Sequence, residues 1–249
     1  MASDASVKVK LYVKRHLPPA TYDYFVAKRR AWHAAKQSSK WRHEQIAIAL
    51  GSREPHLPPL ERECFYAELQ SCKTYLEYGS GGSTLAALKM VPKVISVEND
   101  RAFYRAITRE ARLSITGEYF PLFVNTGRTG EWGFPVTERL TALRIQLWRR
   151  YAVAPWLVIE RNGLLPELIF IDGRFRVACA LESLLRLPPV SDCRIMLDDF
   201  AQFDGAYSPI FEFAEGIETH GRAVKFKRAR NLDQARCRTL LAQYYSDFR

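Results

Sequence analysis

The sequence predicts a three-layer α/β domain with a mainly parallel, seven-stranded sheet, preceded by a basic helical extension. From residue 74 onward, short apolar segments alternate with helix-length segments, which is typical of parallel strands covered by helices on both faces. The chain has 249 residues, of which 47% are hydrophobic, so it can bury a large core. No apolar run reaches the roughly 20 residues that a membrane span requires.

The first part of the chain is expected to be helical. Residues 21–50 are predicted to form a helix, with Thr21 as its N-cap and Gly51 as its stop. The proline-rich residues 52–59 are predicted to be a linker, and residues 60–71 a second helix. The apolar face of that helix is expected to contain Leu60, Cys64, Ala67 and Cys72.

We therefore divide the chain into an extension with its linker, 1–58, and a domain, 59–249. The segments predicted to be parallel strands are 74–78, 93–97, 119–124, 168–171 and 194–197. The segments predicted to be helices are 83–90, 101–112, 138–151, 175–187, 207–215 and a last helix from an Asn231 cap to about Tyr245. Residues 216–229 are predicted to add an antiparallel hairpin, which brings the sheet to seven strands.

Positive charge is concentrated at the two ends of the chain. The formal net charge is +10 at pH 7. Residues 1–62 carry 12 basic and 5 acidic residues, and residues 221–249 carry 8 basic and 2 acidic ones. Such ends are typical of a solubilising surface, or they attract nucleic acid or an acidic partner. No RNA-recognition motif accompanies the charge.

The cysteines indicate a reducing compartment. Their number is odd, no two form a C-x-x-C pair, and four of the five histidines lie far from most of them. Neither a disulfide framework nor a zinc site fits that pattern, so the thiols are expected to be buried and free. The chain begins without an apolar signal segment, and we expect a cytoplasmic protein. The cysteines are Cys64, Cys72, Cys179, Cys193 and Cys237.

The string E-Y-G-S-G-G-S-T, residues 77–84, carries the strongest functional signal. It follows a strand and opens a helix, so its glycines allow a sharp turn close to a ligand. The helix N-terminus adds unpaired N–H groups. Glu98 ends the next strand, where a carboxylate can accept hydrogen bonds from ribose hydroxyls. These features predict a nucleotide-type cofactor at the carboxyl ends of the strands.

Two cofactor classes compete for this turn. The dinucleotide fingerprint requires a third glycine where this chain has Thr84. With Glu77 in front of the turn, the string E-x-G-x-G-G resembles the first motif of the class I S-adenosylmethionine-dependent methyltransferases, which have a Rossmann-like fold. The resemblance implies S-adenosylmethionine as the cofactor. The turn residues that it implies around the cofactor are Gly79, Ser80, Gly81 and Gly82.

The resemblance also implies roles for residues after the neighbouring strands. Glu98, with Asn99 beside it, would hold the ribose, and Glu77 would stand near the methionine ammonium group, directly or through water. Asn125 follows the third strand, where the superfamily places a residue that reads adenine. The strings T-G-E-W-G-F-P, D-G-R-F-R-V-A-C-A-L and D-D-F are similar to a little-characterised group of methyltransferase-like proteins. That group implies a fold and a cofactor pocket but no substrate.

Catalytic candidates follow the fourth predicted strand. Methyl transfer is an in-line displacement in which the protein aligns the nucleophile and removes its proton. Asp172 is the expected proton acceptor, although it could instead cap the following helix. Arg174 is the second catalytic candidate. It and Arg176 could bind a substrate carboxylate or phosphate, or pair with nearby acidic residues.

Two further features leave alternatives open. Asp172, Asp198 and Asp199 could meet over an oxygen-ligated cation, as in catechol-type methyltransferases, but no full ligand set is recognisable and no metal is predicted. Trp132 could cover adenine or a flat substrate, or anchor its loop. The predicted function is methyl transfer to an unidentified acceptor. The alternatives are a non-catalytic binding or assembly protein with this fold, and an NAD(P)-dependent oxidoreductase.

Overall fold

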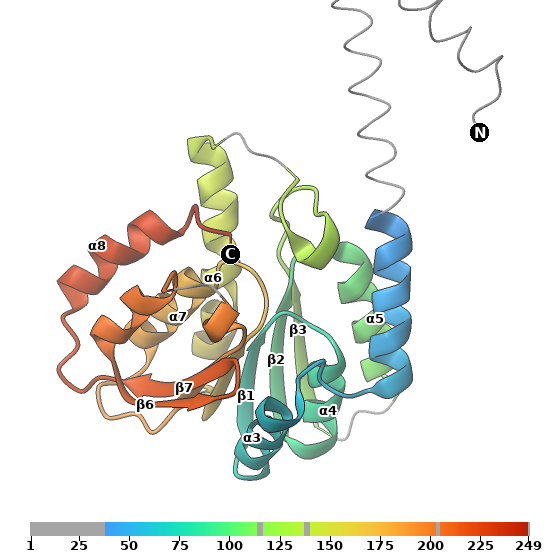
Figure 1. Ribbon diagram of the computed structural model, residues 1–249, viewed down its shortest axis with the longest axis horizontal. Coiled ribbons are helices and arrows are strands. Elements are labelled where there is room, and N and C mark those ends of the chain that lie inside the picture. Colours follow the sequence, from blue (N-terminus) through green and yellow to red (C-terminus); the bar gives the residue numbers. More distant parts are fainter. Residues whose placement is uncertain (1–37, 114–116, 137–139, 203–204, 249) are drawn as a thin grey trace, which may run out of the picture. The chain divides into compact units, whose positions relative to one another are not determined.

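The structure, a computed structural model, describes residues 38–113, 117–136, 140–202 and 205–248 (Figure 1). The chain forms two compact units, Met1–His43 and Glu44–Arg249. Residues 38–43 of the first unit and 44–52 of the second are helical, whereas the predicted cap Thr21 lies outside the described residues. The helix continues past Gly51, because the turn that ends it is at Arg53, which has a left-handed backbone (φ 52°).

The second unit contains a seven-stranded sheet in the order β3-β2-β1-β4-β5-β7-β6. Strands β1 to β5 are parallel, and β7 runs antiparallel to both β5 and β6, so the predicted sheet and hairpin are confirmed (Figure 1). The order of the strands reverses between β1 and β4, which is where open α/β sheets bind ligands. The strands are β1 Thr74–Tyr78, β2 Lys93–Glu98, β3 Glu118–Phe123, β4 Leu168–Ile171, β5 Arg194–Leu197, β6 Ala214–His220 and β7 Ala223–Arg228.

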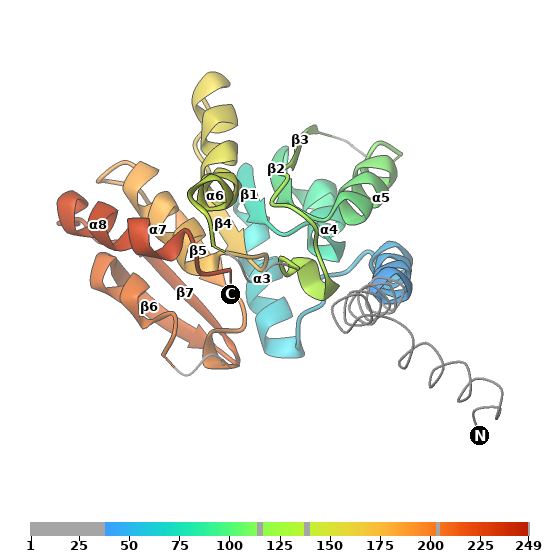
Figure 2. The same ribbon diagram turned by 90° about the horizontal axis from the view of Figure 1, so that it is seen from above.

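Helices cover both faces of the sheet. Figure 2 shows α6, α7 and α8 together on one side and α3, α4 and α5 on the other. Each side encloses its own buried apolar cluster, one around Trp148 and Leu184 and the other around Phe65 and Ile107. All five cysteines are buried and free, as expected. The helices are α3 Pro59–Gln70, α4 Gly82–Met90, α5 Arg101–Ala111, α6 Ala142–Arg161, α7 Arg176–Arg186 and α8 Gln234–Tyr244. Among the described residues, none of the helices has the length and apolarity to cross a membrane.

Several local predictions were wrong. Leu60 is exposed, because α3 turns Glu61, Cys64 and Phe65 inward instead. The last helix is capped by Asp233 rather than Asn231, since the Asp233 carboxylate accepts the Arg236 N–H at 3.0 Å.

Two predicted helices also differ in extent. The segment predicted to be a helix over 207–215 is a 3₁₀ helix, Ser208–Phe213, that leads directly into β6. Helix α6 extends well beyond residue 151 to Arg161 and has Pro155 in its interior.

The segment predicted to be a linker packs on the second unit. Pro55 and Leu57 are buried, and a Cβ at Gly82 would overlap the Glu54 carbonyl group. The chain before α3 therefore lies against the start of α4. The division at residue 58 stays a prediction.

Candidate functional site

The glycine turn joins β1 to α4 at the point where the strand order reverses. Gly79 has a left-handed backbone (φ 102°), and a Cβ there would lie 2.9 Å from Cα of Gly173 in the turn after β4. Only glycine fits there, because two backbones meet. Gly81 differs, since its backbone is extended (φ −174°) and a Cβ would meet no atom within 4 Å. The space beside Gly81 is therefore open to a ligand.

Glu98 joins this turn to the end of β2. Its carboxylate accepts three backbone N–H groups, from Ser80 at 3.0 Å, Asn99 at 2.7 Å and Asp100 at 2.6 Å. Burial raises the pKa of Glu98 to about 7, although the N–H donors act in the opposite direction. A carboxylate has about four acceptor sites, so Glu98 keeps capacity for a further donor such as a ribose hydroxyl.

Glu77 lies beneath the turn. It is fully buried, and its oxygens accept hydrogen bonds from the hydroxyl groups of Tyr75, Ser83 and Thr84. The Thr84 hydroxyl also accepts the Gly81 N–H at 2.9 Å. Burial raises the pKa of Glu77 to about 8. These contacts make Glu77 a support for the turn, and they engage the carboxylate that was expected near a methionine ammonium group.

The two asparagines of the expected site differ in exposure. Asn99 is buried, and its amide donates to the Thr126 hydroxyl at 3.0 Å and to the Gly133 carbonyl at 2.9 Å. It thereby ties the segment after β3 to the end of β2. Asn125 is exposed, and its side-chain oxygen accepts the Gly127 N–H at 3.0 Å. Of the two asparagines, Asn125 is therefore the one that presents its side chain to solvent.

Asp172 follows β4 and does not cap the next helix. Helix α7 begins at Arg176 after Phe175, which has a left-handed backbone and supplies no side-chain cap. Asp172 instead pairs with Arg176, at 3.1 Å, and its side chain remains about one-third exposed (34%). Burial and the neighbouring Asp198 raise the pKa of Asp172.

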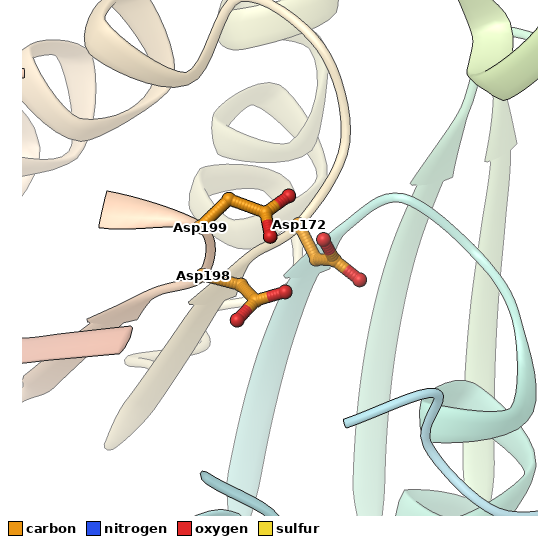
Figure 3. A group of neighbouring side chains, drawn as sticks. All are labelled: Asp172, Asp198 and Asp199. Atoms are coloured by element: carbon orange, nitrogen blue, oxygen red, sulfur yellow. The ribbon is translucent and has the colours of Figure 1, made fainter. Parts of the chain in front are cut away.

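Three carboxyl groups meet at the ends of β4 and β5 (Figure 3). Oxygen atoms of Asp172, Asp198 and Asp199 lie within 4.8 Å of one another. Such a group has the ligand chemistry for a cation. However, Arg176 also pairs with Asp199 at 3.0 Å, and Arg222 pairs with Asp198 at 3.0 Å. The two guanidinium groups thus offset most of the negative charge, and the cluster is an ion-pair network.

Arg174 and Arg176 have opposite environments although they are two residues apart. The guanidinium carbon of Arg174 lies 4.1 Å from the centre of the Phe134 ring. Within the described residues, the Arg174 side chain makes no hydrogen bond, and its Nε is buried without an acceptor. Burial and the Arg176 charge lower its pKa. Trp132, for which covering a ligand and anchoring its loop were both open, is half exposed and parallel to the His56 ring, 6.1 Å between centroids.

Sequence reasoning missed two residues of this region. Arg222 lies in the turn between β6 and β7, and no motif marks it. Phe134 stands inside the T-G-E-W-G-F-P string, where the neighbouring Trp132 drew attention instead. Both are brought to the site only by tertiary contacts.

The sheet order and the turn at the switch point define the class. The chain has the Rossmann-like α/β fold of the class I S-adenosylmethionine-dependent methyltransferases, as the motifs indicated. No protein-family model matches the sequence, and no curated protein matches it either. The chain is similar to a methyltransferase-like protein from Silicibacter pomeroyi, with 28% identity, a TM-score of 0.67, and coverage of 78% of this chain and 97% of that one.

Two more distant solved structures are also methyltransferases. MycE, from the mycinamycin biosynthetic pathway and in complex with Mg and SAH, has 10% identity and a TM-score of 0.41, covering 75% of this chain and 55% of its own. The N-methyltransferase NodS from Bradyrhizobium japonicum has 10% identity and a TM-score of 0.38, covering 69% of this chain and 97% of its own. At these TM-scores they carry no conclusion about the site.

Proposed function

We propose that the chain is an S-adenosylmethionine-dependent methyltransferase that acts on an acceptor not yet identified. The observation that supports this most is the open space beside Gly81, next to the Glu98 carboxylate, where the strand order reverses. Bound there, the cofactor supplies an electrophilic methyl group. The methyltransferase-like protein from Silicibacter pomeroyi, which has the same fold, supports the class of reaction.

The chain's own residues then have distinct roles. By the family resemblance, Gly79, Ser80, Gly81 and Gly82 line the cofactor, with the open space at Gly81, and Glu98 accepts from its ribose. Asn125 contacts the adenine. Glu77 acts indirectly by supporting the glycine turn, and Asn99 acts indirectly by holding the segment after β3. These assignments follow the family resemblance as far as the contacts of each residue allow.

Asp172 removes the proton of the acceptor nucleophile. Its raised pKa suits a proton acceptor near neutral pH, and its partial exposure leaves it accessible from the strand ends. Arg176 orients the Asp172 carboxylate, because its Nη2 atom donates to Asp172 while its Nη1 atom donates to Asp199. Arg176 is therefore a positioning residue.

Calorimetry with S-adenosylhomocysteine and NAD in parallel tests the cofactor. We expect S-adenosylhomocysteine to bind and NAD not to bind. The reverse result would identify an oxidoreductase. Catalysis is tested separately, by incubating protein, nucleic-acid and small-molecule extracts with methyl-labelled cofactor and either the parent or Asp172→Asn.

The parent should label an acceptor that Asp172→Asn does not label, and the two should bind S-adenosylhomocysteine with the same affinity. A parent that binds S-adenosylhomocysteine and labels nothing would be a non-catalytic binding protein with this fold. Equal labelling by parent and variant would remove Asp172 from the mechanism.

A further inference from the structure

Three arginines lie near the carboxyl ends of β4 and β5 and the start of β7, and among the described residues only one of the three has no ion pair with an acidic residue. Arg176 pairs with Asp172 and Asp199, and Arg222 pairs with Asp198. Arg174 makes no ion pair or side-chain hydrogen bond with any residue that the structure describes. The acidic residues of the region are thus engaged by its two neighbours.

The burial of Arg174 makes this lack of partners costly. The residue is 7% exposed, and its Nε has neither solvent nor an acceptor. Leaving a buried charged donor without an acceptor costs more than leaving a buried neutral donor without one. A side chain retained at such a cost is expected to meet an acceptor that comes from outside the chain.

The surroundings of Arg174 define what that acceptor is. The Phe134 ring covers one face of the guanidinium group, and no described residue accepts a hydrogen bond from the Nη atoms at its outer edge, whereas the buried atom without a partner is Nε. A planar carboxylate accepts two parallel N–H bonds from such an edge. One guanidinium also matches the single negative charge of a carboxylate better than the two charges of a phosphate monoester.

We propose that Arg174 binds a carboxylate group of the methyl acceptor. This rests on the proposed function and specifies its substrate class. Arg174 lies two residues after Asp172, so a carboxylate held there places the rest of the acceptor beside the proposed proton acceptor. We expect the carboxylate of the cofactor to bind elsewhere, at the N–H groups at the start of α4.

Benzoate and benzamide form a matched pair of probes, because they have the same shape and differ in charge. Each is titrated by ligand-observed NMR into the full chain saturated with S-adenosylhomocysteine. We expect benzoate to bind at least tenfold more tightly than benzamide. Arg174→Met should abolish that preference, and Arg174→Lys should reduce it, while both keep S-adenosylhomocysteine affinity within threefold. Arg105→Met, which removes an exposed arginine on α5, is the control and should change neither.

Three outcomes overturn the assignment of Arg174 to an acceptor carboxylate. Equal binding of benzoate and benzamide by the parent means that the site does not select an anion. A tenfold loss of S-adenosylhomocysteine affinity in a folded Arg174→Met or Arg174→Lys variant assigns the arginine to the cofactor's carboxylate. Tighter binding of methyl phosphate than of benzoate assigns it to a phosphate. A parent that binds no S-adenosylhomocysteine refutes the proposed function instead, and benzoate selectivity is still measurable on that protein.

Discussion

The two halves of the site are built by different parts of the chain. At the ends of β1 and β2, backbone groups dominate, since Glu98 accepts three N–H groups and Gly79 contacts the backbone of the opposite turn. At the ends of β4 and β5, side chains dominate, with Arg176 and Arg222 holding the three aspartates. The first half therefore suits a fixed, shared cofactor, and the second suits a variable acceptor.

The largest expected effect is on the side-chain half. Arg176→Met would leave its aspartate partners without their buried cation, and we expect a loss of about 3–5 kcal/mol in the free energy of unfolding at pH 8. The loss should be smaller at pH 5, because Asp172, whose pKa is raised to about 7, is then mostly protonated and no longer repels the neighbouring carboxylates. Urea denaturation at both pH values measures this.

A second arginine on the same helix provides the control. Arg186 is more exposed than Arg176 and pairs with the exposed Glu160 and the buried Glu182, which also accepts a hydrogen bond from Tyr245, so Arg186→Met should cost less than Arg176→Met. Equal losses for the two variants would show that the aspartate network contributes no more than the Arg186 pairs.

The next effect is on the backbone half. Gly81→Val should lower S-adenosylhomocysteine affinity at least a hundredfold, about 2.7 kcal/mol, because the branched side chain fills the open space beside the turn. The melting temperature should stay close to that of the parent, since position 81 has an extended backbone and no neighbour within 4 Å.

The matched variant is Gly79→Val. There the left-handed backbone and the contact with Gly173 should reduce stability, so its loss of binding would follow from unfolding. If Gly81→Val binds like the parent, the turn has only a structural role and the cofactor site lies elsewhere.

The same contrast explains what could be predicted from the sequence. The glycine turn, the strand that precedes it and Glu98 are close in sequence, so local patterns were sufficient to place them. The sequence could not show that Arg176 pairs with aspartates while Arg174 does not, because this difference depends on the left-handed backbone of Phe175 between them. Asp172 was a reasonable helix cap by position, but the helix starts too late for it to reach.

Contacts between residues far apart in the sequence account for the site residue that was not predicted and for the core residue that was predicted wrongly. Arg222 reaches the aspartates only through the β6–β7 turn, 24 residues after Asp198. Leu60 looked like a core residue, yet α3 is oriented by Glu61, whose carboxylate accepts the Arg222 N–H at 2.7 Å. A buried acidic residue thus lies on the inward face of α3 together with Phe65 and Leu69, and a hydrophobic pattern alone does not predict that.

A smaller effect concerns the pH dependence of cofactor binding. The ionised form of Glu98 is the one that accepts ribose hydroxyls, and its pKa of about 7 means that it is mostly protonated at pH 6. S-adenosylhomocysteine should therefore bind about tenfold more weakly at pH 6 than at pH 8. Calorimetry at the two pH values tests the sign and the size.

Glu98→Gln separates this residue from other groups that titrate in the range. The variant should bind more weakly than the parent at pH 8 and should show a smaller dependence on pH, because its amide does not ionise. A variant with the full dependence of the parent would assign the titration to another group.

The smallest expected effect is that of removing the N-terminal unit, because the site residues that the structure describes all belong to Glu44–Arg249. Deleting residues 1–43 follows the boundary between the two units, and both S-adenosylhomocysteine affinity and benzoate selectivity should stay within twofold of the parent.

Deleting residues 1–52 also removes Ala49 and Leu50, which pack on the core around Phe65, and should cost about 1 kcal/mol of stability. Urea denaturation of the two truncated chains compares these costs. If the shorter deletion already prevents folding, the first 43 residues complete the core, and the proposed independence of the domain is wrong. If it leaves folding intact but abolishes benzoate selectivity, the extension contributes to acceptor binding, and the second half of the site is not built by the domain alone.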